Sequence, residues 1–215
     1  MLGQINLGTN LGDHIFRLAQ RPDIQTIVEI GTWNGLGSTL CVIEAIKDNR
    51  NKVLISIEAY KDMYQTAKNN LGVFKRSMGD RLKLLNGTII TPEDLNWIDI
   101  QQITAEVNQG IAPSEIHVEH FKLWLHRDIE TISSADNILH LMPKKIDMLI
   151  LDGGEYSTYP EWLKLKDRTK IFVLDDTRLL KCKRIRQEML DSEQYKVIVD
   201  SISDRNGYAI FEVII

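Results

Sequence analysis

Hydrophobic residues along the chain fall into short β-branched runs separated by longer stretches with helical spacing. After the run at 26–30, apolar residues return every three or four positions, at Leu36, Leu40, Ile43 and Ile46. Further runs of strand character occupy 53–57, 81–89, 146–151, 170–174, 195–199 and 208–213. A helical stripe between 60 and 71 is expected to end at Gly72. Strands that alternate with helices are typical of a parallel sheet, so an α/β fold is expected.

The last two expected strands flank the polar segment 203–207, which contains an Asn-Gly pair. This pair is a strong signal for a tight turn between antiparallel strands. The chain is therefore predicted to form a Rossmann-like, doubly wound, mostly parallel seven-stranded sheet that ends in an antiparallel hairpin. We expect a single domain over residues 1–215.

More than fifty residues separate the third and fourth expected strands, too many for a simple crossover. Thr91 followed by Pro92 has the pattern of a helix start, and a later apolar stripe comprises Phe121, Trp124, Leu125, Ile129 and Ile132. A helical insertion is therefore predicted at approximately 91–140. Two placements are open, because the insertion could cover a ligand crevice at the strand ends or pack against the flank of the fold.

Charge and composition narrow the range of functions. The chain has 215 residues, a formal net charge of −4 and only two cysteines, Cys41 and Cys182. This balance argues against nucleic acid as a partner, and the basic run 181–186 on an expected helix is interpreted as a solvated face. No secretory signal or membrane-spanning run is present in the sequence, so a cytoplasmic protein with reduced thiols is expected. The oligomeric state is left open.

The segment 29–39, EIGTWNGLGST, joins the first strand to the first helix. Gly31, Gly35 and Gly37 permit a tight turn and a close ligand approach, and a helix that starts near Leu36 would direct its N–H groups at an anion. A dinucleotide turn has the spacing G-x-G-x-x-G, whereas this chain has G-x-x-x-G-x-G with Glu29 two positions before the first glycine. The spacing weakens a nicotinamide or flavin hypothesis.

This segment resembles the first motif, D/E-x-G-x-x-x-G-x-G, of S-adenosylmethionine-dependent methyltransferases of the Rossmann-like class, and the resemblance covers most of the chain. It implies that Glu29 orients the ammonium group of the cofactor. It further implies that the three glycines, with Thr32 in the same turn, admit the methionine tail, and that Ser38 binds the carboxylate of that tail.

Glu58 ends the second expected strand, 58 − 37 = 21 positions after Gly37. This offset is close to the roughly 20 residues typical of ribose-binding acids, so its carboxylate is expected to accept both ribose hydroxyls. The resemblance implies that Ala59 and Tyr60 pack near adenine, although Tyr60 could instead begin the core stripe of the next helix. Thr88, at the end of the third expected strand, is a further candidate for binding the cofactor.

Three carboxylates follow the fourth and fifth strands: Asp152, Asp175 and Asp176. Because the carboxyl ends of adjacent parallel strands meet at one edge, these side chains are expected to be neighbours. Mg²⁺ would neutralise them and could lower the pKa of an acceptor hydroxyl. The pattern resembles metal-dependent small-molecule O-methyltransferases of the catechol and sugar types. The alternative is that Asp176 caps the next helix while Asp152 supports a turn.

Sugar enzymes of that group carry a catalytic aspartate two residues after the first metal-binding aspartate, where this chain has Gly154. The adjacent Glu155 could substitute, so Asp152 and Glu155 are the catalytic candidates. His117, His120 and His126 in the insertion match no zinc signature and are interpreted as a polar helix face, although one of them could serve as a general base from a lid.

The resulting hypothesis is an enzyme that transfers a methyl group from S-adenosylmethionine to a hydroxyl of a small acceptor, with a carbohydrate or another polyol fitting the resemblance best. A metal or a carboxylate base would ionise the hydroxyl. Two alternatives remain open. One is a nucleotide-cofactor oxidoreductase on the same fold, and the other is a non-catalytic S-adenosylmethionine-binding module, which Gly154 keeps open.

Overall fold

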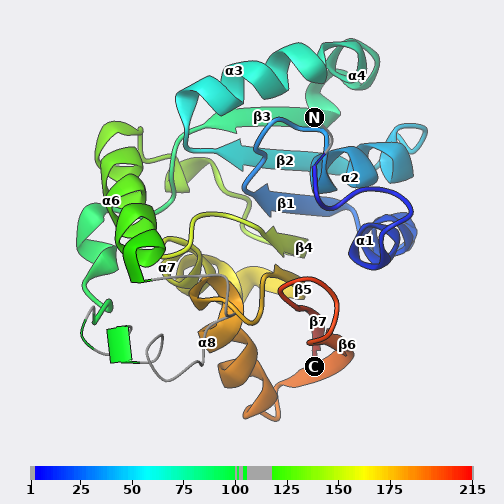
Figure 1. Ribbon diagram of the computed structural model, residues 1–215. Coiled ribbons are helices and arrows are strands. Elements are labelled where there is room, and N and C mark those ends of the chain that lie inside the picture. The colour runs from blue at the N-terminus through cyan, green and yellow to red at the C-terminus, as the bar shows by residue number, and fades with distance from the viewer. Residues whose placement is uncertain (1–2, 100, 102–103, 106–117, 215) are drawn as a thin grey trace.

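The centre of the protein is a seven-stranded sheet with the strand order β3-β2-β1-β4-β5-β7-β6 (Figure 1). The computed structural model describes residues 3–99, 101, 104–105 and 118–214. The strands are β1 (Thr26–Ile30), β2 (Val53–Glu58), β3 (Leu82–Asn86), β4 (Ile146–Leu151), β5 (Thr169–Asp175), β6 (Tyr195–Ser201) and β7 (Tyr208–Val213). The first five strands pair in parallel, and β7 runs antiparallel to both β5 and β6. The predicted fold class is confirmed.

Strand β3 is shorter than the predicted run 81–89 because the chain turns at Gly87. This residue has a φ of 151°, and a Cβ atom there would lie 2.6 Å from the carbonyl oxygen of Asp136. Beyond the turn, Thr88 forms an isolated parallel bridge with Asn137. The segment that follows β3 is thus fixed against the segment that connects α6 to β4.

Helices cover both faces of the sheet. They are α1 (Asn10–Gln20), α2 (Ser38–Ile46), α3 (Lys61–Asn70), α4 (Gly72–Met78), α6 (Val118–Ser134), α7 (Thr158–Leu165) and α8 (Leu180–Leu190). Successive strand residues point to opposite faces, so Ile27 packs with α1 and α2 while Val28 packs with α6, α7 and α8. The buried strands read as continuous apolar runs because both faces are covered.

Three helix starts depart from the sequence-based expectations. Helix α1 was not predicted, although Thr9 caps it by accepting a hydrogen bond from the Gly12 N–H at 3.2 Å. Helix α2 begins at Ser38 and not near Leu36. Gly72 follows the end of α3 but also starts α4, so the predicted helix end is immediately followed by a second helix.

The insertion between β3 and β4 contains α6. The two placements expected for it, over a ligand crevice and against the flank of the fold, are both found. Phe121 and Ile132 are buried in the core on the α7–α8 side of the sheet, while Ile129 of the expected stripe is exposed. Other α6 residues line a cavity at the strand ends. The helix therefore packs on the fold and covers a crevice with the same turns. Among the described residues, no helix is both long enough and apolar enough to cross a bilayer.

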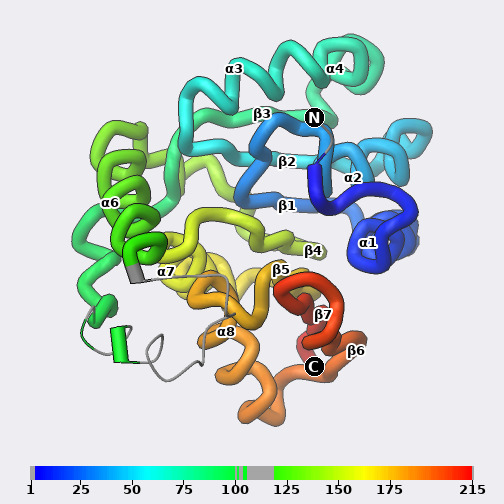
Figure 2. Tube along the Cα trace, viewed as in Figure 1, coloured from blue at the N-terminus to red at the C-terminus, as the bar shows by residue number. Residues whose placement is uncertain are grey.

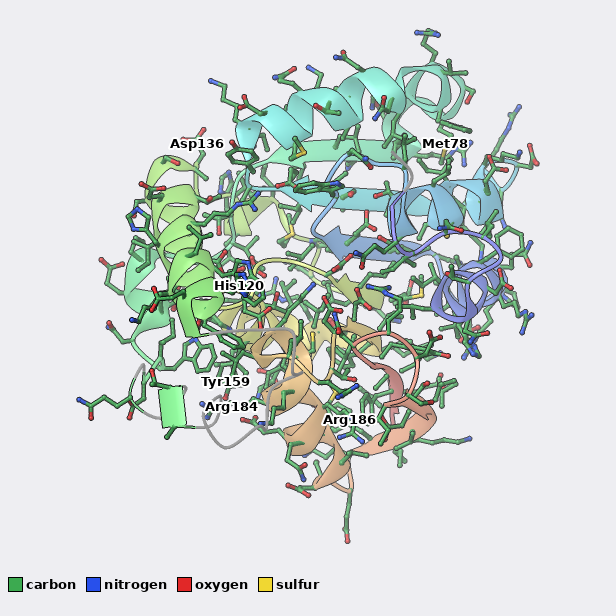
Figure 3. All side chains as sticks on the ribbon, viewed as in Figure 1. Met78, His120, Asp136, Tyr159, Arg184 and Arg186 are labelled. Atoms are coloured by element: carbon green, nitrogen blue, oxygen red, sulfur yellow. The ribbon has the colours of Figure 1, made fainter. Side chains whose placement is uncertain are left out.

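Helix α7 supplies the largest side chain of the core on its face of the sheet. Trp162 is 2% exposed, whereas its neighbour Leu163 is 40% exposed. On the same helix Tyr159 stacks with Arg184 of α8, whose guanidinium carbon is 4.2 Å from the ring centroid (Figure 3). This aromatic layer therefore joins α7 to both the sheet and α8.

We expect Trp162→Ala to lower the free energy of unfolding by about 3–5 kcal/mol, because it removes a buried indole and leaves a cavity. The matched control, Leu163→Ala, removes an exposed side chain and should change the free energy by less than about 0.5 kcal/mol. Urea denaturation followed by circular dichroism measures both. Equal losses in the two variants would contradict the packing described for α7.

Candidate functional site

A cavity of about 600 Å³ opens at the carboxyl ends of the central strands. It lies where the strand order reverses direction between β1 and β4, which is where open α/β sheets bind ligands. Residues from the strand ends, α6 and the start of α8 line it, among them Gly31, Glu58, Thr88, Arg127, Asp152 and Lys181. The volume and concave shape suit a small organic ligand.

Glu58 faces the turn after β1. Its Oε2 accepts a hydrogen bond from the Trp33 N–H at 2.7 Å, and its Oε1 accepts one from the Tyr60 N–H at 2.8 Å. Burial raises the pKa of Glu58, although these two N–H groups act in the opposite direction. The Trp33 side chain is 51% exposed and does not fill the turn. The carboxylate is therefore fixed in position, and each oxygen keeps a lone pair for a ligand.

Arg127 of α6 reaches over the same end of the cavity. Its guanidinium carbon lies 5.3 Å from the centroid of the Tyr60 ring and 6.0 Å from that of Trp33. Tyr60 is half exposed and faces this cation, so it does not begin the core stripe of α3. Ala59 and Thr88 also line this part of the cavity. Helix α6 thus covers the end at which Glu58 lies.

The glycine-rich turn divides into residues that line the cavity and residues behind it. Gly31 lines it with a φ of 98°, and a Cβ atom there would lie 2.0 Å from the carbonyl oxygen of Asp152. The other predicted residues of this turn are not among the described residues that line the cavity: Glu29, Thr32, Gly35, Gly37 and Ser38. Only part of the predicted cofactor-binding set therefore faces the space where a ligand would lie.

Glu29 is fully buried behind the turn. Its Oε2 accepts hydrogen bonds from Thr39 Oγ1 at 2.6 Å and from Ser56 Oγ at 2.5 Å. Ser56 also shares a hydrogen bond with Thr32 at 2.5 Å between their Oγ atoms. Burial raises the pKa of Glu29. In this arrangement Glu29 links β1, β2 and α2. The role that the resemblance implied, orienting the ammonium group of the cofactor, stays a prediction.

Residues near the N-terminus lie across the start of α2 (Figure 2). The Gly3 N–H donates to the Leu36 carbonyl at 3.0 Å, and a Cβ atom on Gly3 would lie 2.6 Å from Cα of Gly37. Gln4 lines the cavity, and its Oε1 accepts from Arg205 Nη2 at 2.7 Å. Gln4 could not be predicted from the sequence, because no local motif relates it to either the turn or Arg205.

The three predicted carboxylates converge. Asp152, Asp175 and Asp176 each place an oxygen within 4.8 Å of the other two. Asp152 and Asp176 line the cavity. Burial raises the pKa of Asp175 to about 7 even though Arg205 Nη2 lies 3.2 Å from its Oδ2. Parallel strand ends therefore bring these groups together, as their positions in the sequence predicted.

A cation from the chain itself lies among these acids. The Nζ atom of Lys181 lies 2.8 Å from Asp152 Oδ1 and 2.8 Å from Asp176 Oδ2. Burial alone would raise the pKa of Asp176, but the ammonium group holds it below its usual value. The interpretation of 181–186 as a solvated face is wrong at Lys181, which is buried at the start of α8. Within a basic run the sequence does not single out this lysine, because Asp176 lies before the helix and Asp152 is 29 positions away on another strand end.

Further carboxylates line the part of the cavity next to α7. Glu155 Oε1 accepts from the Lys181 N–H at 3.3 Å, and burial raises the pKa of Glu155 to about 7. Asp128 of α6 accepts from the Tyr156 N–H at 2.7 Å, and a Cβ atom on Gly154 would lie 2.5 Å from Asp128 Oδ1. Asp128 was missed from the sequence, since only the folded insertion brings it to Gly154.

The histidines of the insertion do not form a cluster within the described residues. His120 lines the cavity on the edge of α6 nearest the centre of the molecule (Figure 3), while His126 is exposed and lies 3.1 Å from Glu130. His117 lies outside the described residues. In the part of the chain that the structure describes, the three aspartates are the group with the spacing of metal ligands.

No family model and no curated protein sequence matches this chain. Solved structures do match over most of its length. An O-methyltransferase from Bacillus cereus, in complex with S-adenosylhomocysteine, is 14% identical with a TM-score of 0.58, covering 100% of this chain and 84% of that one. An O-methyltransferase of tomaymycin synthesis from Streptomyces achromogenes, in complex with S-adenosylmethionine, is 12% identical with a TM-score of 0.59, covering 99% and 83%.

A third match has the same architecture. A methyltransferase from Podospora anserina, bound to S-adenosylhomocysteine, is 13% identical with a TM-score of 0.59, covering 95% of this chain and 78% of that one. At such low identity the likeness concerns the fold. The chain therefore has the Rossmann-like fold of these methyltransferases, as the resemblance of its glycine-rich turn implied.

Glu161 of α7 gives a pH test of this acidic cavity. Burial raises the pKa of Glu161 to about 8 from an ordinary value of 4.5. A raised folded-state pKa contributes stability that is present below pH 4.5 and lost as the pH rises towards 8. Glu161→Gln stays neutral, so from pH 5 to pH 8 its free energy of unfolding should gain about 3 kcal/mol relative to the original chain.

Chemical denaturation at several pH values measures this difference. Glu193→Gln, which makes the same substitution at an exposed position, serves as the control. A constant difference for Glu161→Gln would show that this carboxyl group titrates normally in the folded protein.

Proposed function

We propose that the protein binds S-adenosylmethionine in the cavity between β1 and β4 and transfers its methyl group to a hydroxyl of a small acceptor. The observation that carries this proposal is the Glu58 carboxylate, held opposite the glycine turn at the carboxyl edge of a methyltransferase-type sheet. We further propose that the chain acts as a single cytoplasmic domain, which is consistent with its two buried free thiols.

The lining residues fit the two halves of this cofactor. Glu58 would accept the ribose hydroxyls, with Ala59, Tyr60 and Thr88 beside the adenine. Gly31 leaves room at the turn for the methionine part, where Gln4 offers a further amide. Arg127 stacks against Tyr60 and would close over the adenosine. Ser38, which the resemblance placed at the carboxylate of the methionine part, lies at the start of α2, and the N-terminal segment lies over that start.

The cofactor would supply an electrophilic methyl group, and the chain would supply position and a base. Glu155 lines the cavity, and its pKa of about 7 suits a group that takes a proton near neutral pH. As the acceptor oxygen forms its bond to the methyl carbon, its proton would pass to the Glu155 carboxylate, and the electron pair of the broken C–S bond would stay on sulfur. Asp152 is paired with the Lys181 ammonium, so it would not act as the base and would instead help to position Lys181. Helix α6 would exclude water from this step.

The acceptor class follows from the donors and acceptors around the cavity. Asp128, Glu155 and Glu161 line the space next to α6 and α7. Carboxylates accept hydrogen bonds from hydroxyls, so a carbohydrate or another polyol would find several partners there. Trp124 and His120 add ring surfaces on the α6 side, which suit the apolar face of a sugar.

Mg²⁺ assistance, which the three aspartates suggested in the sequence, meets an obstacle. The ammonium of Lys181 already stands between two of the three carboxylates. The residues present therefore do not fit a resident divalent ion, and the proposed reaction uses no metal step.

Isothermal titration tests the cofactor proposal. The protein should bind S-adenosylhomocysteine, and Glu58→Ala should weaken binding about tenfold or more, because it removes the charged acceptor of the ribose hydroxyls. Glu193→Gln, at an exposed position far from the cavity, should leave the affinity unchanged. Parallel titrations with NAD and NADP test the oxidoreductase alternative. Binding of these nucleotides in place of S-adenosylhomocysteine would overturn the proposal, and cofactor binding without turnover on sugar and phenol libraries would favour the non-catalytic alternative.

A further inference from the structure

The acidic cluster contains its own counter-ions. Its three carboxylates face two cations, since Lys181 bridges Asp152 and Asp176 while Arg205 Nη2 lies 3.2 Å from Asp175 and 3.6 Å from Asp176. Three like charges within 4.8 Å in a buried place repel one another strongly unless they are compensated. The two cations nearly balance the cluster, so it needs no additional divalent ion for neutrality.

Lys181 is held in this position from two directions. Its backbone N–H donates to Glu155 Oε1 at 3.3 Å, while its side chain reaches the aspartates from the start of α8. Asp176 is fixed as well, because its Oδ1 accepts from Asn206 Nδ2 at 3.1 Å and its backbone adopts a φ of 54°. The position of the ammonium is therefore fixed by contacts of both the backbone and the side chain, unlike that of a lysine that rotates freely at the surface.

The Nζ atom occupies space that a divalent ion would need. Mg²⁺ binds oxygen ligands at about 2.0–2.1 Å with octahedral geometry. Lys181 contacts Asp152 Oδ1 and Asp176 Oδ2 at 2.8 Å each, so an ion that used these two oxygens as ligands would lie where Nζ lies. The ammonium and the metal exclude each other there, by both volume and charge.

We infer that the Lys181 ammonium takes the place of the divalent cation in this site, so that the site works without a metal. This inference rests on the proposed function for its chemical meaning. Lysine carries three N–H donors, and the two aspartates take two of them. Within the described residues only these two carboxylates contact Nζ, so the third N–H could donate to the oxygen of an acceptor in the cavity that Lys181 lines. It would orient that oxygen by a charge-assisted hydrogen bond.

Manganese binding tests the inference without any need for an acceptor. Electron paramagnetic resonance of free Mn²⁺ should show no specific binding to the original chain below about 1 mM. Lys181→Met removes the ammonium and leaves three carboxylates together, so it should bind one Mn²⁺ at least about tenfold more tightly. Lys181→Gln serves the same purpose if the methionine variant fails to fold. Lys181→Arg keeps the charge and should resemble the original chain, as should Lys196→Met on the exposed part of β6.

Thermal unfolding of the same samples gives a second readout. MgCl₂ should raise the melting temperature of the neutral Lys181 variants and leave that of the original chain unchanged, because only an ion bound to the folded state stabilises it. Tight Mn²⁺ binding by the original chain, or no gain of affinity in either neutral variant, would overturn the inference. Titration with S-adenosylhomocysteine distinguishes the two proposals: failure to bind it would reject the methyltransferase assignment, while the manganese result still decides the role of Lys181.

Discussion

The close approach of β1 and β4 at their carboxyl ends is the constraint on which the candidate site depends. Gly31 leaves β1 where the Asp152 carbonyl passes so near that no side chain could fit, and the Asp152 N–H donates to Ile30 at 3.0 Å. The two chains then diverge, one towards α2 and the other towards α7. This divergence creates the crevice and places Glu58 on one side of it and Asp152 on the other.

Charge compensation is the second organising principle. Many carboxylates line the cavity, and the cations among the described residues that line it are Lys181 and Arg127. Each of these two cations contacts more than one acid or aromatic ring. Lys181 contacts Asp152 and Asp176. Arg127 of α6 covers Tyr60 and partly opposes the burial that raises the pKa of Glu58. Burial of unpaired charge is costly, so removal of either cation affects several groups together.

The sequence predicted the sheet well because buried parallel strands are continuous apolar runs, and β1, β4 and β7 have the predicted boundaries. It also predicted that the aspartates after β4 and β5 converge, since topology alone requires this. The sequence did not predict the site residues whose position depends on tertiary contacts. Lys181 belongs to a basic run, and nothing local distinguishes its buried ammonium from the exposed guanidinium of Arg184. Asp128 and Gln4 reach the cavity only through the folded insertion and N-terminal segment.

The hydrogen bond between Gln4 and Arg205 joins residues 201 positions apart. Arg205 precedes β7, a strand that inserts between β5 and β6, and its loop also holds the turn after β5 through Asn206. During synthesis on the ribosome the glycine turn and Glu58 emerge early, but the acidic cluster cannot be fixed until the closing hairpin has left the exit tunnel. Nascent chains would therefore form the Glu58 side of the cavity before the side that holds the acidic cluster.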